Sequence, residues 1–158
     1  MAKRRKKSSL PIGTILTAVA CLLGIAAVCM MFLDAIETAV GTVYTGVQTA
    51  FGYSETLGPI TTKILDVNVL ALLAYLLPVA GILVALVGFK SKLLSLISCA
   101  VFVVAGVFAF LMATTFPATV IGSDWVQVEA SIKIGAILCG VFSLVAAACE
   151  LLKLVFKK

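Results

Sequence analysis

The chain has no histidine and few charged residues, which make up 12% of its 158 positions. Soluble domains carry about 25% charged residues, so the composition argues against a soluble fold. Histidine is the side chain best suited to acid and base catalysis near neutral pH. The sequence also contains no glycine-rich phosphate loop, no HExxH pair and no GxSxG nucleophile turn. We therefore predict a protein that is not an enzyme and that has no catalytic residue, cofactor or metal site.

Cysteine is missing from every segment that would lie in water. The five cysteines fall inside apolar runs, at Cys21, Cys29, Cys99, Cys139 and Cys149. An extracellular domain held by disulfides would need cysteines in its loops, and a metal site would need a CxxC or Cys/His spacing. The sequence has neither, so we expect the cysteines to pack as small apolar side chains.

Long apolar runs are abundant, and hydrophobic residues make up 63% of the chain. A helix needs about 20 apolar residues to cross the hydrocarbon core of a bilayer. Four runs are long enough: 10–33, 67–89, 93–115 and 131–155. The first is too long for a cleaved signal peptide, so we expect it to stay as an anchor. These runs predict an all-α, integral membrane four-helix bundle, a multipass protein of the cell membrane.

The segments between the runs differ in charge. They comprise a basic tail (1–9), a long segment (34–66), a short turn (90–92), a second loop (116–130) and a short end (156–158). Ten of the twelve Lys and Arg residues lie in or next to 1–9, 90–92 and 156–158; the other two are Lys63 and Lys133. Because short loops rich in Lys and Arg stay in the cytoplasm, we predict cytoplasmic N and C termini and a larger first extracellular loop.

The basic tail contains five consecutive cations: Lys3, Arg4, Arg5, Lys6 and Lys7. Their first role is to set the orientation of the first helix. Clusters of this kind next to a bilayer also bind anionic lipid headgroups. No aromatic or recognition motif accompanies the run, so we predict contact with lipid and no contact with nucleic acid.

The segment 34–66 allows two interpretations. Apolar residues recur at helical spacing, which favours an amphipathic helix; they are Ile36, Val40, Val43, Val47 and Phe51. The abundance of Thr, Val, Tyr and Gly favours strands instead. We predict the helix and keep a short β-hairpin as the alternative. In the second loop, Asp124 and Gln127 fit a capping box, which predicts a helix start there.

Small residues recur every fourth position on the predicted spans. They are Gly135, Cys139, Ser143 and Ala147 in the fourth span, Ala105, Ala109 and Ala113 in the third, Gly81 and Ala85 in the second, and Ala20 and Gly24 in the first. Small residues let helix backbones approach closely in lipid. The favoured interpretation is contact within one bundle, and the alternative is an oligomer face that packs against another chain.

A few polar residues lie in or near the spans. Glu150 is three residues from Lys153, so we expect a salt bridge with both side chains reaching the inner interface; ion or proton handling is the alternative. Asp34, Glu37, Asp66 and Asn68 lie at the outer ends of the first two spans and are expected to form a solvated rim, with a cation-attracting cluster as the alternative. Pro78 predicts a kink in the second span.

The layout is similar to that of claudins and other tetraspan families, which share inner termini and a larger first outer loop. Claudins carry a Trp-rich signature and a cysteine pair in the first outer loop, and tetraspanins carry cysteine motifs in the second. This chain has no Trp in 34–66 and no Cys in either outer loop. The resemblance therefore covers topology alone, and no residue role is carried over.

The missing chemistry, the short loops and the small-residue stripes together favour a structural or accessory subunit of a membrane assembly. Its expected partners are the bilayer and either further copies of itself or another membrane protein. The alternative is an oligomeric channel or transporter subunit, or a holin-like pore former. That alternative requires oligomerisation, because four mostly apolar helices offer few polar groups to line a pore.

Overall fold

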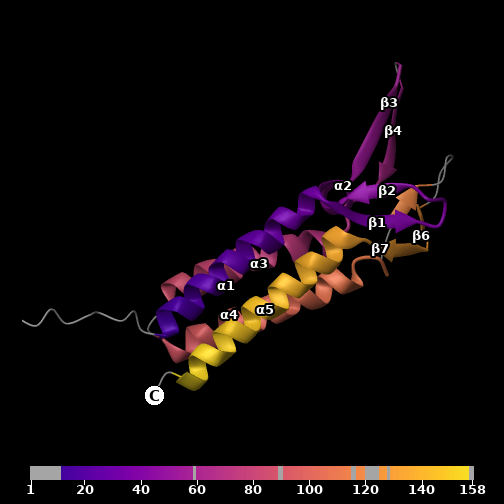
Figure 1. Cartoon of the computed structure of the whole chain (residues 1–158). Coiled ribbons are helices and arrows are strands. Elements are labelled where there is room, and N and C mark those ends of the chain that lie inside the picture. Colours follow the sequence, from indigo (N-terminus) through magenta and orange to yellow (C-terminus); the bar gives the residue numbers. More distant parts are fainter. Residues whose placement is uncertain are drawn as a thin grey trace, which may run out of the picture.

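Four long helices run side by side and form the body of the molecule (Figure 1). The computed structural model describes residues 12–58, 60–88, 91–114, 117–119, 125–127 and 129–156. The helices are α1 (Ile12–Cys29), α3 (Val69–Val87), α4 (Lys92–Leu111) and α5 (Ile134–Phe156), and a short 3₁₀ turn, η1 (Met30–Phe32), extends α1. All four are long and apolar enough to span a membrane, as the apolar runs predict.

Local sequence fixes where two of these helices begin. Asn68 caps α3, since its side-chain oxygen accepts hydrogen bonds from the backbone N–H groups of Leu70 and Ala71 at 3.0 and 3.2 Å. Ser91 caps α4 in the same way through the N–H of Leu94. Pro78 lies inside α3, and the chain is helical on both sides of it.

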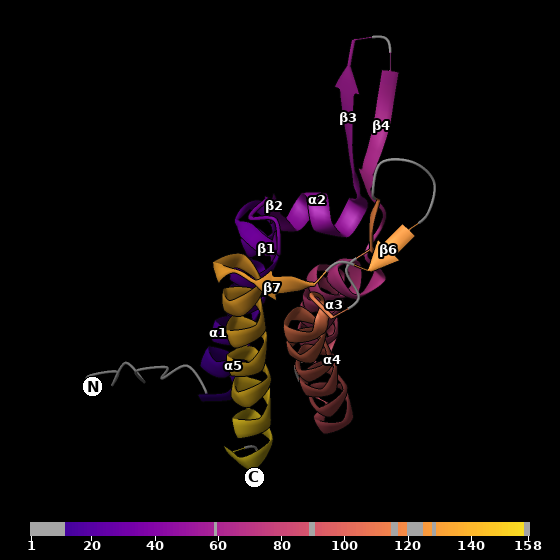
Figure 2. The ribbon, with the colours of Figure 1, turned by 90° about the vertical axis from the view of Figure 1, so that its right-hand side faces the viewer.

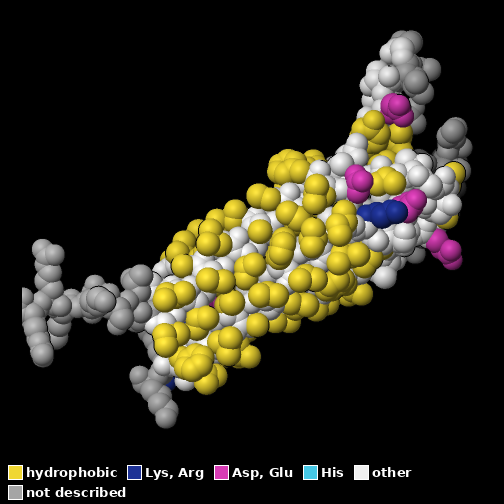
Figure 3. Space-filling view, in the orientation of Figure 1, with side chains coloured by type: hydrophobic (Ala, Val, Ile, Leu, Met, Phe, Trp, Pro, Cys, Tyr) yellow, Lys and Arg dark blue, Asp and Glu magenta, His cyan; other side chains and the backbone are white. Residues whose placement is uncertain are grey.

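The outward faces of the helices are apolar. Side chains such as Leu22, Leu83 and Leu93 are more than half exposed, and Figure 3 shows apolar side chains along the whole length of the bundle. Acidic side chains gather at one end on that face. A surface of this kind suits lipid rather than water, which supports a multipass membrane protein.

The predicted all-α fold is confirmed only in part: the structure is mostly helical, but the described residues between the long helices also form two small sheets. The first sheet has the order β2-β1-β7, with β1 (Asp34–Thr38), β2 (Val43–Thr45) and β7 (Ala130–Ile132). The second has the order β3-β4-β5-β6, with β3 (Tyr53–Leu57), β4 (Ile60–Leu65), β5 (Pro117–Thr119) and β6 (Trp125–Gln127). All described pairings in both sheets are antiparallel.

The amphipathic helix predicted within 34–66 is also wrong for most of that segment. Ile36 is buried in β1, whereas Val40 and Phe51 are exposed, so the helical stripe does not face one side. Among the described residues of this segment, only α2 (Gly46–Phe51) is helical; a capping box between Thr45 and Gln48 starts it. The segment forms strands because many of its residues favour strands and because β1 pairs with β7, far along the chain. The helical spacing of its apolar residues involves only five positions, which can match by chance.

The two ends of the bundle differ, and we name them for their contents (Figure 2). The sheet end carries both sheets and α2. The terminal end carries Ile12 and Phe156, the first residue of α1 and the last of α5. At the sheet end β1 follows α1 and η1, and it pairs with β7, which directly precedes α5. Gln127 lies in β6, so the helix start predicted from the Asp124 capping box is wrong; Asp124 itself lies outside the described residues.

Candidate functional site

An ion pair lies inside the bundle near the terminal end. Lys153 Nζ is 3.2 Å from Glu150 Oε2, and both residues belong to α5. Both are buried, at 1% and 0% exposure respectively. Lys and Glu are almost never fully buried unless they are paired. Ionisable groups among membrane helices commonly mark functional or assembly-critical positions, so this pair is the first candidate for a site.

Helix α1 packs against this pair. A Cβ atom at Gly13 of α1 would lie 3.7 Å from Lys153 Cγ, so the stem of Lys153 packs against this glycine. Thr17, one turn further along α1, is buried and donates a hydrogen bond to the Gly13 carbonyl. At the same end α4 buries Ser95 and Ser98, and Ser98 donates to the Gly81 carbonyl of α3 at 2.8 Å. The terminal end therefore concentrates buried polar groups from α1, α4 and α5.

Two polar atoms of this group have no hydrogen-bond partner within the described part of the chain: Glu150 Oε1 and Ser95 Oγ. A buried carboxylate oxygen without a donor is costly, since the desolvation of the group is not offset. Across the described ranges, no three His, Cys, Asp or Glu side chains gather as a metal ion would require. The chemistry available here is that of a buried carboxylate beside an ammonium group.

The salt bridge predicted between Glu150 and Lys153 is confirmed. The prediction that both side chains reach out to the interface is wrong, because both are buried and α1 packs against Lys153. Spacing along one helix reveals which residues share a face, but it does not reveal which face the other helices cover.

The small-residue stripes lie inside the bundle. Eight of their nine committed positions are buried: Ala20, Gly24, Ala105, Ala109, Gly135, Cys139, Ser143 and Ala147. Ala113 is half-buried. Gly81 and Ala85 of α3 are buried as well. The stripes therefore bring the four helices of one chain together, and these faces are not available to a second chain.

Polar residues at the sheet end do not form the cation-attracting cluster kept as an alternative. Asp66 pairs with Lys63 at 2.8 Å, and Glu37 pairs with Lys133. Asn68 is buried, where it caps α3 and donates to the Met112 carbonyl of α4 at 2.8 Å. Asp34 is exposed on β1. These side chains serve different local contacts, so they do not converge on one point.

The titration of Asp66 should reveal its pairing. The hydrogen bond from Lys63, followed by that from the Val67 N–H, lowers the pKa of Asp66 below its ordinary value. A lowered pKa stabilises the fold at pH values above the unfolded pKa, and this contribution is lost as the pH falls through the folded value. We expect Lys63→Gln to raise the pKa of Asp66, measured by carboxyl NMR in nanodiscs. Lys133→Gln is the control and should leave it unchanged. An unaltered Asp66 titration in Lys63→Gln would contradict the pairing.

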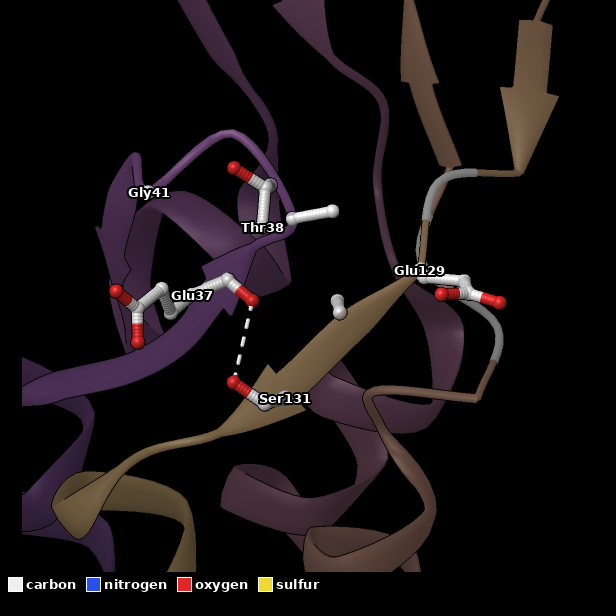
Figure 4. A pocket seen from close by; sticks show the side chains of 7 residues that line it. Glu37, Thr38, Gly41, Glu129 and Ser131 are labelled. Atoms are coloured by element: carbon white, nitrogen blue, oxygen red, sulfur yellow. Dashed lines mark hydrogen bonds between the residues drawn. The ribbon is translucent and has the colours of Figure 1, made fainter.

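A shallow cleft of about 410 Å³ lies where β1 and β7 pair. Its lining includes Glu37, Thr38 and Gly41 on one side and Glu129 and Ser131 on the other (Figure 4). Ser131 donates to the Glu37 carbonyl at 3.5 Å. The carboxylates of Glu37 and Glu129 lie on opposite sides of the cleft and do not point toward each other. The cleft is therefore not built to hold a cation between them.

The β3–β4 hairpin projects from the sheet end, away from the bundle (Figures 1 and 2). Among the side chains that the structure describes here, those exposed on the two strands are polar: Ser54, Glu55, Thr56, Thr61 and Lys63. At its base the rings of Tyr44 and Tyr53 lie 6.4 Å apart, which ties β3 to β2. Burial, followed by the proximity of Tyr53 and Glu55, raises the pKa of Tyr44. Sequence reasoning placed a possible hairpin in this segment but did not identify it as the projecting element.

Comparisons with known proteins give no further assignment: no family model, no curated protein and no solved structure matches this chain. The predicted lipid contacts, Lys3, Arg4, Arg5, Lys6 and Lys7, lie outside the described residues. The arrangement of the described residues therefore carries the functional argument alone.

Proposed function

We propose that this chain is a non-enzymatic multipass membrane protein that serves as a structural or accessory subunit of a membrane assembly. The observation that carries this proposal is the projecting β3–β4 hairpin, which presents exposed polar side chains such as Glu55 and Thr61 and is built on a membrane-type bundle. Beyond its base, where β4 pairs with β5 and Tyr53 lies beside Tyr44, the strand pair extends away from the bundle. An element of this kind is suited to contact another protein.

Contact through the sheet end replaces the oligomer face on the helices that the sequence left as an alternative. The small-residue stripes are buried within the chain, so close packing of a second chain would have to use the bulky lipid-facing side chains instead. The hairpin needs no such rearrangement, because its polar side chains already face water. The partner is either another membrane protein or a protein next to the membrane.

The charge pattern supports an orientation with both termini in the cytoplasm and the sheet end outside. The segments 1–9, 90–92 and 156–158 hold nine of the twelve Lys and Arg residues. Ile12 and Phe156 lie at the terminal end, and two of these segments are close to them in the sequence. Positive loops remain cytoplasmic, and the tail residues Lys3–Lys7 would there contact anionic lipid headgroups.

A channel, transporter or holin-like role is the second candidate, and the buried Glu150–Lys153 pair is the observation that favours it. Charged residues among membrane helices often lie on ion or proton pathways. The bundle interior, however, is filled along much of its length by apolar side chains such as Ala74, Phe102 and Ala146. Proton or ion flux in liposomes containing only this protein would support the second candidate.

Site-specific photocrosslinking in native membranes tests the first candidate. A photoreactive amino acid at Thr61 of the hairpin should capture a partner protein, whereas one at the lipid-facing Leu83 should not. A partner captured at Leu83 but not at Thr61 would move the contact to the helices and contradict the proposal. If neither Thr61 nor Leu83 yields a crosslinked product, and liposomes containing the protein show ion flux, the second candidate is favoured.

A further inference from the structure

We propose that the free edge of β3 binds an extended, basic segment of a partner protein by strand addition. This inference rests on the proposed function and names the surface and the chemistry of the partner. β3 is the edge strand of the order β3-β4-β5-β6. In the two views no described element lies beside it on the side away from β4 (Figures 1 and 2). A free edge presents unpaired backbone N–H and C=O groups to which an extended chain can pair.

The register of the hairpin shows which backbone groups are free. Thr56 pairs with Thr61, and their hydroxyls lie 3.3 Å apart. Such close side chains are typical of a non-hydrogen-bonded pair, in which the N–H and C=O groups point away from the partner strand. Ser54, two residues earlier, pairs with Lys63 and has the same orientation. Ser54 and Thr56 therefore offer their backbone groups to an incoming strand, and Glu55 offers its own to β4.

The charges of the sheet end decide the chemistry of the partner. The described residues of the sheet end include two bases, Lys63 and Lys133, so their net charge with the five acids is 2 − 5 = −3. The acids are Asp34, Glu37, Glu55, Asp66 and Glu129. Both bases are engaged in ion pairs, with Asp66 and Glu37. Glu55 lies exposed between Ser54 and Thr56 and forms no ion pair within the described residues. A strand with Lys or Arg opposite Glu55 would supply the missing charge.

A second copy of this chain fits the edge less well. Antiparallel pairing of two β3 strands centred on Glu55 places two carboxylates opposite each other, and like charges in that position are destabilising. The remaining unpaired acids of the two sheet ends add to the repulsion. The opposite edge of the hairpin, formed by β4, is also less suitable. β4 already pairs with β5 at Leu65, and the charged side chain of β4 is Lys63, which would repel a basic segment.

The test uses the full chain in nanodiscs and labelled peptides of about eight residues that alternate Val and Thr around one central charge. We expect the peptide with a central Lys to bind about tenfold more tightly than the one with a central Glu at low salt, and the gap to narrow as salt is added. Glu55→Lys should reverse this preference, and Glu55→Gln should abolish it. Equal binding of the two peptides, or binding of neither, would overturn the proposal.

Two matched proline variants test the edge itself. Thr56→Pro removes an outward N–H from β3, and Thr61→Pro removes the corresponding outward N–H from β4; neither removes a bond between the two strands. We expect Thr56→Pro to weaken the Lys peptide about tenfold and Thr61→Pro to leave its binding unchanged. The opposite pattern would overturn the assignment to β3. The protein could also dimerise in the absence of peptide. If Thr56→Pro abolished that dimer, the occupant of the edge would be a second copy of this chain, and the proposal would be overturned.

The subunit role and the binding of a partner strand at β3 are contradicted by different results. If the photocrosslinked partner remains bound in Thr56→Pro and Glu55→Lys, the proposed function stands and the edge proposal falls. If no partner is captured but the Lys peptide binds with the expected dependence on Glu55 and Thr56, the edge is a competent binding surface and the subunit role fails.

Discussion

Lys153→Met is expected to lower the free energy of unfolding by about 3–5 kcal/mol. The variant leaves Glu150 fully buried with neither of its oxygens paired, because Oε2 loses Lys153 and Oε1 has no partner within the described part of the chain. Burying an unpaired charge costs far more than losing the packing of one long side chain. The measurement is equilibrium unfolding in mixed micelles of a mild detergent and SDS.

The control for this prediction removes both charges at once. Glu150→Leu combined with Lys153→Met retains apolar side chains at both positions and leaves no buried charge, so its stability should lie close to that of the parent or above it. A single variant within about 1 kcal/mol of the parent would contradict a paired and buried Glu150. A double variant as unstable as the single one would show that packing of the Lys153 stem on Gly13 dominates.

Gly135→Ala should have the second-largest effect, a loss of about 1–3 kcal/mol. A Cβ atom at this position would lie 2.8 Å from the Asp34 carbonyl oxygen, 3.0 Å from that of Met30 and 3.1 Å from that of Leu33. These are backbone atoms of the connection from α1 into β1, so they cannot rotate away as a side chain would. The substitution should push the start of α5 away from that connection and lower stability in the same unfolding measurement.

Gly13→Ala is the matched control on α1. Its Cβ atom would meet only Lys153 Cγ at 3.7 Å, an ordinary contact. Alanine is favoured over glycine in a helix by about 1 kcal/mol, so this variant should be neutral or slightly more stable. Equal losses in Gly13→Ala and Gly135→Ala would indicate a general intolerance of substitution in this bundle and would contradict the close contact assigned to Gly135.

The sequence by itself determined the number and approximate position of the long helices. Uncharged runs such as 67–89 and 93–115 are long enough to cross a bilayer, and no soluble fold could cover so much apolar surface. The Glu150–Lys153 salt bridge followed for a similar reason, since residues three apart lie on one face of any helix. Both predictions depend only on composition and on the local geometry of a helix.

The tertiary structure decided what those local rules leave open. Ile36 lies in a strand because it pairs with Ile132, nearly a hundred residues further along the chain, and no window around Ile36 contains that information. The burial of Glu150 and Lys153 depends on neighbouring parts of the chain such as Gly13 of α1, which a helical wheel of α5 does not show. The small-residue stripes likewise predicted close packing, but only the arrangement of all four helices directs them inward. Contacts between distant segments fix strand pairing and helix orientation, so these features require the three-dimensional structure.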